Sequence, residues 1–388
     1  MKDPFRPSNR LQALPTYLFE GIDRIKQAQT DQGRHLISLG IGDPDLAPSN
    51  AVLKRMAEAL QNPDNHRYPS YQGMSSLRKA IAKWYEKRFD VILDPDTEVL
   101  VLIGSKEGIA HLPLAFVNPH ETVLVPDPSY PVYQAATLLA GGIPIPFALK
   151  AKNHFLPNFE QLQTLVHQFS PRILFLNYPN NPTSASANVA FFEEATCFAQ
   201  KNNLFICHDN AYSEIYYEGK KQPSFLQASA AKSVGCEFHS LSKTFNMAGW
   251  RVGFVVGNAS IIQRLGQLKT HIDSGIFNAC QEAAITALEN YEEFTHNLRT
   301  TYQKRRDLFI PALQSLGLKC ICPEATFYAW AQLPQGTSSE RFVMDLIENQ
   351  GIVATPGSGF GKYGEGYIRF ALCAELDILT QAVTRLHT

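Results

Sequence analysis

The run Ser240-Leu-Ser-Lys-Thr-Phe-Asn-Met-Ala-Gly-Trp-Arg-Val-Gly-Phe254 is the part of the chain from which the rest is best interpreted. It places Lys243 among small hydroxyl residues, and Arg251 follows eight positions later at the start of an apolar segment. A lysine amine can form a Schiff base with a carbonyl compound, while hydroxyl groups and an arginine can hold a phosphate nearby. The run therefore predicts a turn that presents one amine to a phosphorylated carbonyl compound.

Two upstream segments place more polar residues at the ends of predicted elements. One is Asn180-Asn-Pro-Thr183, and the other is Phe205-Ile-Cys-His-Asp-Asn-Ala-Tyr212, in which a short apolar strand ends at His208 and Asp209. Open α/β sheets collect their ligands at strand ends. An asparagine, an aspartate followed by a tyrosine, and a lysine are therefore expected around one ligand. Pyridoxal phosphate has the carbonyl and the phosphate that the lysine run requires.

In this order, the segments resemble the signature of the class I/II aminotransferases, which have fold type I of the pyridoxal-phosphate enzymes. The resemblance rests on Asn181-Pro-Thr183, Asp209-Asn-Ala-Tyr212, Ser240-Leu-Ser-Lys243 and Arg251, and it extends from Gly40-Ile-Gly-Asp-Pro-Asp45 to Tyr367-Ile-Arg-Phe370. It implies a ping-pong transfer of an amino group between an L-amino acid and a 2-oxo acid. It also implies an α/β fold, with a mostly parallel seven-stranded sheet between helices and a smaller α+β domain.

Composition indicates the broad class of protein. The chain has 388 residues, of which 45% are hydrophobic and 18% are charged, so it can bury a large core, and its length suggests two domains. A formal net charge of −1 argues against a surface for nucleic acid or anionic lipid. The first residues lack the apolar core of a signal peptide, and no apolar run reaches the roughly 18 residues of a membrane span. A cytoplasmic protein that binds neither nucleic acid nor membrane is expected.

The seven cysteines are scattered, and none forms a Cys-x-x-Cys pair. This usage is typical of reduced, mostly buried thiols in an intracellular protein. Cys320 and Cys322 alternate within Leu318-Lys-Cys-Ile-Cys322, so both would face one side if this segment is a strand, but no histidine stands at ligand spacing. No metal site is predicted.

Changes in hydrophobic periodicity outline the domains. Helical spacing is found at Ala51–Leu60, Met74–Phe89 and Tyr291–Leu316. Short apolar runs separated by helical stretches predict a largely parallel sheet that is covered on both faces. These runs are Glu98–Ile103, Thr122–Pro126, Ile173–Leu176, Leu204–Cys207, Glu237–Leu241 and Arg251–Val256. We expect residues 46–285 to form the large domain, and residues 1–45 together with 286–388 to form the small one.

The chemistry of pyridoxal phosphate assigns roles to four of these residues. The cofactor is an electron sink that works best when its ring nitrogen stays protonated, and a buried carboxylate such as Asp209 enforces that state. Tyr212 and Asn181 are expected to donate hydrogen bonds to the phenolic oxygen and so to stabilise its anion. Lys243 is expected to hold the cofactor and to act as general acid and base.

The phosphate of the cofactor needs backbone N–H groups at a helix start, together with hydroxyl groups and cations. Gly104-Ser105-Lys106 predicts such a start, and Ser240 and Arg251 would complete the phosphate site. The family resemblance places Ser105 and Lys106 there. It also implies that Tyr130 stacks on the cofactor ring and that Tyr68 reaches the phosphate of a neighbouring subunit, so a homodimer with shared active sites is implied.

The resemblance also suggests how substrate binds. Arg369 matches the arginine that forms a bidentate pair with the substrate α-carboxylate, and Gly42 would offer its N–H to the same group. Within the family the chain is most similar to the LL-diaminopimelate aminotransferases, which serve lysine biosynthesis. That similarity rests on Tyr17-Leu-Phe19, Gly104–His111, Asn278 and Thr355–Gly361. It implies that Tyr17 and, from the partner subunit, Asn278 contact the substrate, and that LL-diaminopimelate and 2-oxoglutarate are the substrate pair.

Two residues depart from the pattern. Tyr71 stands where plant-type enzymes have a glutamate that meets the distal ammonium group of the substrate, and Ser184 stands where the family usually has glycine. Alanine aminotransferases of similar sequence also share Ser-Lys-Glu-Gly and Asn-Met-Ala-Gly-Trp-Arg. An alanine or aspartate aminotransferase, or a pyridoxal-phosphate-dependent lyase on the same fold, therefore remains an alternative.

Overall fold

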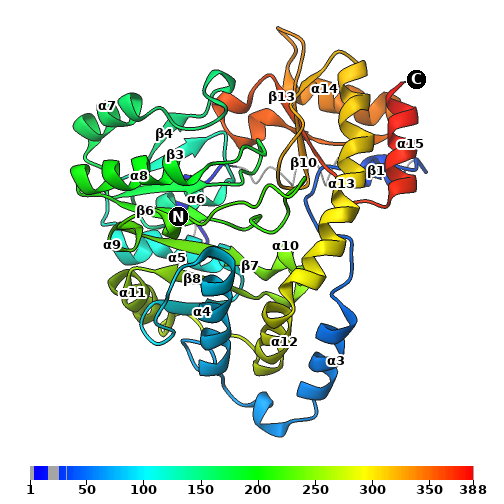
Figure 1. Cartoon of the computed structure of the whole chain (residues 1–388). Helices are drawn as coiled ribbons and strands as arrows, with labels where there is room; N and C mark the ends of the chain where they lie inside the picture. Colours follow the sequence, from blue (N-terminus) through cyan, green and yellow to red (C-terminus); the bar gives the residue numbers. More distant parts are fainter. Residues whose placement is uncertain (1–3, 16–25, 32, 388) are drawn as a thin grey trace.

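A seven-stranded sheet forms the centre of the larger part of the molecule (Figure 1). The computed structural model describes residues 4–15, 26–31 and 33–387. The sheet order is β2-β8-β7-β6-β5-β3-β4. Its strands are β2 (Val99–Leu102), β3 (Thr122–Asp127), β4 (Ile143–Ala148), β5 (Ile173–Asn177), β6 (Phe205–Asp209), β7 (Gly235–Ser240) and β8 (Gly253–Gly257). Neighbours are parallel except where β8 pairs with β2 and β7. The predicted mostly parallel seven-stranded sheet is confirmed.

Six of these strands lie within two residues of the ranges expected from the apolar runs. The strand that the runs did not identify is β4, whose sequence Ile-Pro-Ile-Pro-Phe-Ala contains Pro144 and Pro146. Proline cannot donate to a strand ladder, so within sheets it is confined mainly to edge strands. β4 is an edge strand that pairs with β3 alone, which explains how it tolerates both prolines.

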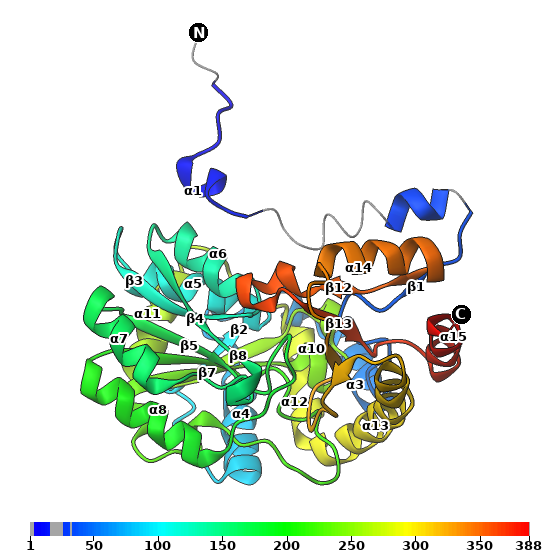
Figure 2. The ribbon, with the colours of Figure 1, turned by 90° about the horizontal axis from the view of Figure 1, so that it is seen from above.

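Helices cover both faces of this sheet (Figure 2). One face packs against α5 (Ser105–Phe116), α6 (Val132–Leu139) and α11 (Ala259–Lys269). The other packs against α4 (Ser75–Phe89), α7 (Phe159–Phe169), α8 (Val189–Asn202) and α12 (Asn278–Glu289). The shorter helices α9 (Ala231–Val234) and α10 (Leu241–Thr244) flank β7, and α3 (Asn50–Ala59) packs on α12. Burial on both faces is what near-continuous apolar strands require.

A second core is formed by the smaller part of the molecule. Its four-stranded antiparallel sheet has the order β12-β13-β10-β9, and β1 pairs in parallel with β11 in a separate two-stranded sheet. These strands are β1 (Ile37–Ser38), β9 (Lys319–Cys320), β10 (Tyr328–Gln332), β11 (Ile352–Val353), β12 (Thr355–Pro356) and β13 (Tyr367–Ala371). The helices are α13 (Tyr291–Ser315), α14 (Ser339–Asp345) and α15 (Leu376–Leu386). A smaller domain thus accompanies the large sheet, as expected, while its boundaries stay a prediction.

The N-terminal segment contacts both parts. Ile37 pairs with Ile352 in the small part. The short helix α1 (Asn9–Gln12) instead lies near α6, where Arg10 donates to the carbonyl of Leu139 at 3.4 Å (Figure 2). The described part of residues 1–45, a range expected to belong to the small domain, therefore also contacts the large part.

Cys320 and Cys322 do not share one strand, so the condition for both to face one side is not met. The strand β9 ends at Cys320, which is buried, whereas Cys322 is exposed, because the chain leaves strand geometry between them. Cys207, Cys236 and Cys280 are buried as well. Among the residues that the structure describes, no helix combines the length and the apolar character needed to cross a bilayer.

Candidate active site

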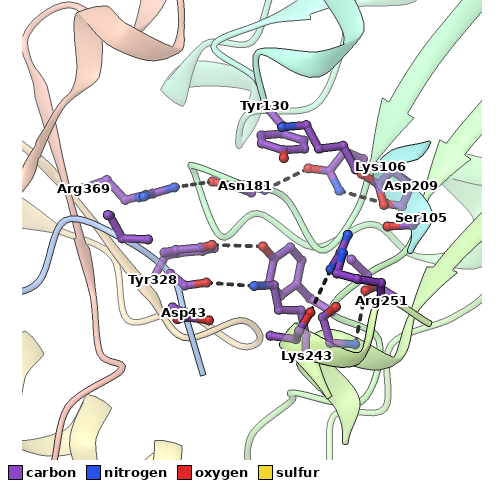
Figure 3. A pocket seen from close by; sticks show the side chains of 18 of the residues that line it. Asp43, Ser105, Lys106, Tyr130, Asn181, Asp209, Lys243, Arg251, Tyr328 and Arg369 are labelled. Carbon is purple, nitrogen blue, oxygen red and sulfur yellow. Dashed lines mark hydrogen bonds between the residues drawn. The ribbon is translucent and has the colours of Figure 1, made fainter. Parts of the chain in front are cut away.

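A cavity of about 570 Å³ lies where the carboxyl ends of β5 and β6 face the small sheet (Figure 3). Arg369 lies on one side of this pocket, and Ser105 and Asp209 lie on the opposite side. Eleven of the fourteen predicted site residues line it: Gly42, Ser105, Lys106, Tyr130, Asn181, Asp209, Tyr212, Ser240, Lys243, Arg251 and Arg369. The structure therefore brings residues 327 positions apart in sequence, from Gly42 to Arg369, into one pocket.

Asp209 is held with one carboxylate oxygen available to a ligand. It ends β6, where Asn177 of the neighbouring strand donates through Nδ2 to its carbonyl at 2.8 Å. The hydroxyl of Tyr133 donates to Oδ2 at 2.8 Å, whereas buried Oδ1 has no hydrogen-bond partner among the described residues. Burial raises the pKa of Asp209, and the Tyr133 hydrogen bond opposes that rise. Because an unpaired buried acceptor is costly, this oxygen suits a ligand that brings a cationic N–H group.

Lys243 lies in the short helix α10 that follows β7. Ser240 caps this helix by accepting a hydrogen bond from the backbone N–H of Ser242 at 3.2 Å. The Nζ of Lys243 donates to the carbonyl of Gly42 at 2.8 Å. Burial lowers the pKa of Lys243 and so favours the neutral amine, which is the nucleophilic form.

Tyr212 and Asn181 meet Arg369 of β13 on the side of the pocket nearest the small sheet. The Tyr212 hydroxyl lies 2.9 Å from that of Tyr328, and burial raises the pKa of Tyr212, so the phenol stays protonated and can donate. Asn181 accepts from Arg369 Nη1 at 2.7 Å, while Arg369 Nη2 donates to the carbonyl of Gly40 at 2.6 Å. The guanidinium is thus oriented before any substrate arrives.

The predicted phosphate site is formed by the first turn of α5. Helix α5 begins at Ser105, directly after Gly104, whose φ is +76°. A side chain at Gly104 would overlap with the guanidinium of Arg251, so glycine is what allows this cation to approach the helix start. Free N–H groups at a helix start, an arginine and the Ser240 hydroxyl together suit a phosphate. Lys106 Nζ lies 5.8 Å from the centre of the Tyr130 ring, beside the same turn.

Tyr68 and Asn278, two described residues predicted for the site, do not line the pocket. Tyr17 lies outside the described residues. Tyr68 is 90% exposed, and Asn278 begins α12. The segments that carry Tyr68 and Asn278 lie next to each other: a Cβ atom at Gly275 would be only 2.8 Å from the carbonyl oxygen of Ser70.

Some pocket residues were missed by the sequence analysis, among them Asn177 and Tyr328. Asn177 is the last residue of β5 and pairs in register with Asp209, so the rule that ligands gather at strand ends could have identified it. Its Oδ1 also accepts from the backbone N–H of Asn181 at 2.9 Å. No local pattern marks Tyr328, which reaches the pocket through the pairing of β10 with β13.

Ser184 shows how the chain accommodates one departure from the family pattern. Its φ of +59° lies in the left-handed region that favours glycine. Its hydroxyl is 2.7 Å from that of Thr326 and donates to the carbonyl of Tyr328 at 2.9 Å. These two buried contacts offset the strain of a side chain at this position. Tyr71, the other departure, is 45% exposed and does not line the pocket.

The groups that line the pocket match the ring nitrogen, the carbonyl group and the phosphate of pyridoxal phosphate. Asp209 offers an unpaired carboxylate oxygen for the ring nitrogen, and Lys243 offers an amine whose pKa is lowered. The helix start at Ser105 with Arg251 suits the phosphate. Together these groups suit the three functional groups of one ligand.

Comparison with known proteins agrees with this geometry. Residues 34–386 match the family model described as aminotransferase class I and II. LL-diaminopimelate aminotransferases of Aquifex aeolicus and Nitratidesulfovibrio vulgaris (strain Miyazaki F) are each 49% identical, over 98% of this chain and 98% of theirs. The solved structure of substrate-bound BacF from Bacillus subtilis has a TM-score of 0.93 and 37% identity, covering 99% of this chain and 97% of that one. The chain therefore belongs to the class I and II aminotransferases and is a pyridoxal-phosphate-dependent transaminase.

Proposed function

We propose that this enzyme transfers an amino group from LL-diaminopimelate to 2-oxoglutarate, reversibly and by a ping-pong mechanism, as a step of lysine biosynthesis. The observation that carries the proposal is full-length similarity, at 49% identity, to proteins named LL-diaminopimelate aminotransferase. The oriented guanidinium of Arg369, buried beside Asn181, supports a substrate with an α-carboxylate.

Each pocket residue has a role in this proposal. Bound pyridoxal phosphate supplies an electron sink for the bonds at the substrate Cα. Lys243 holds the cofactor and, once its amine is released, moves the proton at Cα, since burial lowers its pKa and so favours the neutral amine, which can act as a base. Asp209 keeps the ring nitrogen protonated, and Tyr212 and Asn181 donate to the phenolic oxygen. Ser105, Lys106, Ser240 and Arg251 hold the phosphate, and Tyr130 stacks on the ring.

The direct test is to assay the purified holoenzyme with LL-diaminopimelate, alanine, aspartate and aromatic amino acids, each against 2-oxoglutarate. The highest kcat/KM with LL-diaminopimelate supports the proposal, and a higher value with another amino acid contradicts it. The departure at Tyr71 is the reason to include alanine and aspartate, because the glutamate that meets a distal ammonium group in plant-type enzymes is missing here. Glutamate formed in equal amount to the amino acid consumed separates a transaminase from a lyase.

Replacing Arg369 by lysine is expected to raise KM for both the amino acid and the 2-oxo acid by about 10-fold to 100-fold, because a point charge cannot replace the planar fork. The effect on kcat should be smaller, since the carboxylate is bound in both the ground state and the transition state. Steady-state kinetics with each substrate varied in turn measures this. Arg172→Lys, at a half-exposed arginine outside the pocket, is the matched control. Unchanged KM values in Arg369→Lys would refute the anchor role.

We also infer a cytoplasmic homodimer in which each active site is completed by the partner. Tyr68 and Tyr71 are exposed on one chain, as are Phe277 and Ile272, and their segments adjoin. Exposed aromatic clusters of this kind favour an interface between subunits. In this dimer Tyr68 reaches the partner's phosphate, and Asn278 and Tyr17 contact substrate.

Mixing two inactive variants tests the shared site. Lys243→Ala and Tyr68→Ala chains, exchanged into mixed dimers, should recover roughly a quarter of wild-type activity, because half of the dimers are hybrids and each hybrid has one intact site. Activity after subunit exchange is compared with the sum of the separate variants. An activity no greater than that sum would exclude a shared site.

A further inference from the structure

We propose that Tyr328 is a positioning residue that links the two binding functions of the pocket: its ring supports the guanidinium of Arg369, and its hydroxyl donates a hydrogen bond to the hydroxyl of Tyr212 (Figure 3). The inference rests on the proposed function, in which Arg369 binds the substrate carboxylate and Tyr212 binds the phenolic oxygen of the cofactor. The sequence around Tyr328 indicates neither role.

The ring contact follows from strand register. Arg369 on β13 stands opposite Trp330 of β10, and Tyr328 lies two residues before Trp330, so Tyr328 and Arg369 are diagonal neighbours on one face of the sheet. The Cζ of Arg369 lies 4.3 Å from the centre of the Tyr328 ring. Both side chains are buried, with exposed fractions of 2% and 1%. A cation over an aromatic face is held more strongly when both groups are removed from water.

The hydroxyl contact crosses between the two parts of the molecule. Tyr328 begins β10 of the small sheet, whereas Tyr212 follows β6 of the large sheet, and their hydroxyl oxygens are 2.9 Å apart. Either hydroxyl could be the donor by geometry alone. When Tyr212 directs its hydrogen to the cofactor, only Tyr328 can donate in this pair. Burial raises the pKa of Tyr328 although Arg369 opposes the rise, so the hydroxyl stays protonated and able to donate.

The surroundings hold Tyr328 in one place. Its backbone N–H donates to Thr326 Oγ1 at 3.1 Å, and its carbonyl accepts from Ser184 Oγ at 2.9 Å. A side chain at Gly42 would overlap with the Tyr328 hydroxyl, so glycine at this position leaves the room that the hydroxyl occupies. The carbonyl of the same glycine accepts from Lys243. Tyr328 therefore contacts the groups that bind substrate and those that bind cofactor at once.

Tyr328→Phe isolates the hydroxyl. A hydrogen bond from the Tyr328 hydroxyl makes the Tyr212 hydroxyl a stronger donor. A stronger donor stabilises the phenolic anion of the cofactor. The visible absorbance of the holoenzyme therefore changes with pH at a lower midpoint. Losing this hydroxyl should raise that midpoint by about half a pH unit. KM for the amino acid and the 2-oxo acid should stay within about twofold, because the ring beneath Arg369 remains.

Tyr328→Leu removes the ring as well. It should show the same midpoint shift and, in addition, an increase of about 10-fold in KM for both substrates, because Arg369 loses its aromatic support. Tyr178→Phe is the matched control: Tyr178 is a buried tyrosine outside the pocket, whose hydroxyl donates to the carbonyl of Phe155 at 2.8 Å. This control should match wild type in both midpoint and KM.

The outcomes separate two kinds of failure. A wild-type holoenzyme without transamination refutes the proposed function before any variant is compared. A Tyr328→Phe holoenzyme that titrates with the wild-type midpoint refutes the hydroxyl link, and equal KM values in Tyr328→Phe and Tyr328→Leu refute the support of Arg369. Circular dichroism of the apo forms identifies a variant that has not folded. For such a variant, Tyr328→Met replaces Tyr328→Leu, because methionine also lacks the ring, and it should show the raised KM values together with the raised midpoint.

Discussion

Replacing Lys243 by alanine is expected to abolish transamination, with a loss of at least about 10⁴-fold in kcat, because the change removes both the attachment of the cofactor and the base that moves the proton. The visible absorbance of the Schiff base between the protein and pyridoxal phosphate should disappear together with the activity. Lys243→Arg should be equally inactive, since it keeps a cation at the position but not a reactive amine. Absorbance spectra and single-turnover assays measure both effects.

The control for this change is Lys54→Ala, at an exposed lysine of α3 that pairs weakly with Glu58 at 4.0 Å. It should keep wild-type spectra and kcat. Normal turnover in Lys243→Ala would end the assignment of the site, whatever the behaviour of the other variants.

The environment of Lys243 also sets a pH dependence. Burial lowers the pKa of Lys243, so at any pH below the usual lysine range the buried amine is neutral more often than a free lysine. Capture of the cofactor by the apo protein should therefore persist to lower pH than capture by free lysine. Binding of pyridoxal phosphate, followed by absorbance across pH, measures this, and equal pH profiles would contradict it.

Asp209→Asn is expected to lower kcat by about 10²-fold to 10⁴-fold, because a neutral amide cannot keep the cofactor ring nitrogen protonated. Asp209 lines the pocket, and the structure leaves one of its carboxylate oxygens unpaired. Oδ1 is buried and lacks a hydrogen-bond partner among the described residues, while Oδ2 accepts a hydrogen bond from Tyr133. In the apo protein, burial raises the pKa of Asp209, and a cationic N–H group beside Oδ1 would favour its ionised form. Steady-state kcat, together with the spectrum of the holoenzyme, measures the change.

A suitable comparison is Asp127→Asn. Asp127 is a buried carboxylate at the end of β3 in the same sheet, but it lies outside the pocket and accepts from the backbone N–H groups of Lys362 and Tyr363 at 3.0 and 2.9 Å. Its replacement should affect stability more than kcat. If Asp209→Asn and Asp127→Asn lose the same small fraction of kcat, Asp209 does not keep the ring nitrogen of the cofactor protonated.

Much of the pocket could be predicted because its residues stand in short motifs. Asp209 ends an apolar run and Lys243 follows one, so the rule that ligands gather at strand ends predicts both at the same edge of the sheet. Ser105 was predicted at a helix start because Gly104 precedes it, and α5 begins at that residue. These features are local, and local patterns are what hydrophobic periodicity and turn residues report.

Other residues could not be predicted in this way. The strand β4 was missed because its two prolines resemble a loop unless the strand is known to lie at an edge. Tyr328 was missed because nothing in its neighbourhood indicates that its hydroxyl meets that of Tyr212, 116 positions earlier. Tyr68 and Asn278 lie outside the pocket of a single chain, and their predicted roles depend on a partner subunit.

Local patterns in the chain are enough to identify the reactive groups and their order after the strands, from Asn181 through Asp209 to Lys243, since each lies at the end of a locally encoded element. The position of Arg369 against Asn181 and the ring of Tyr328, across the pocket from Asp209, is known only from the folded chain. This placement depends on the register of β10 with β13 and on the packing of the small sheet against the segment that follows β6. Register and packing are properties of long-range contacts, which no short stretch of sequence contains.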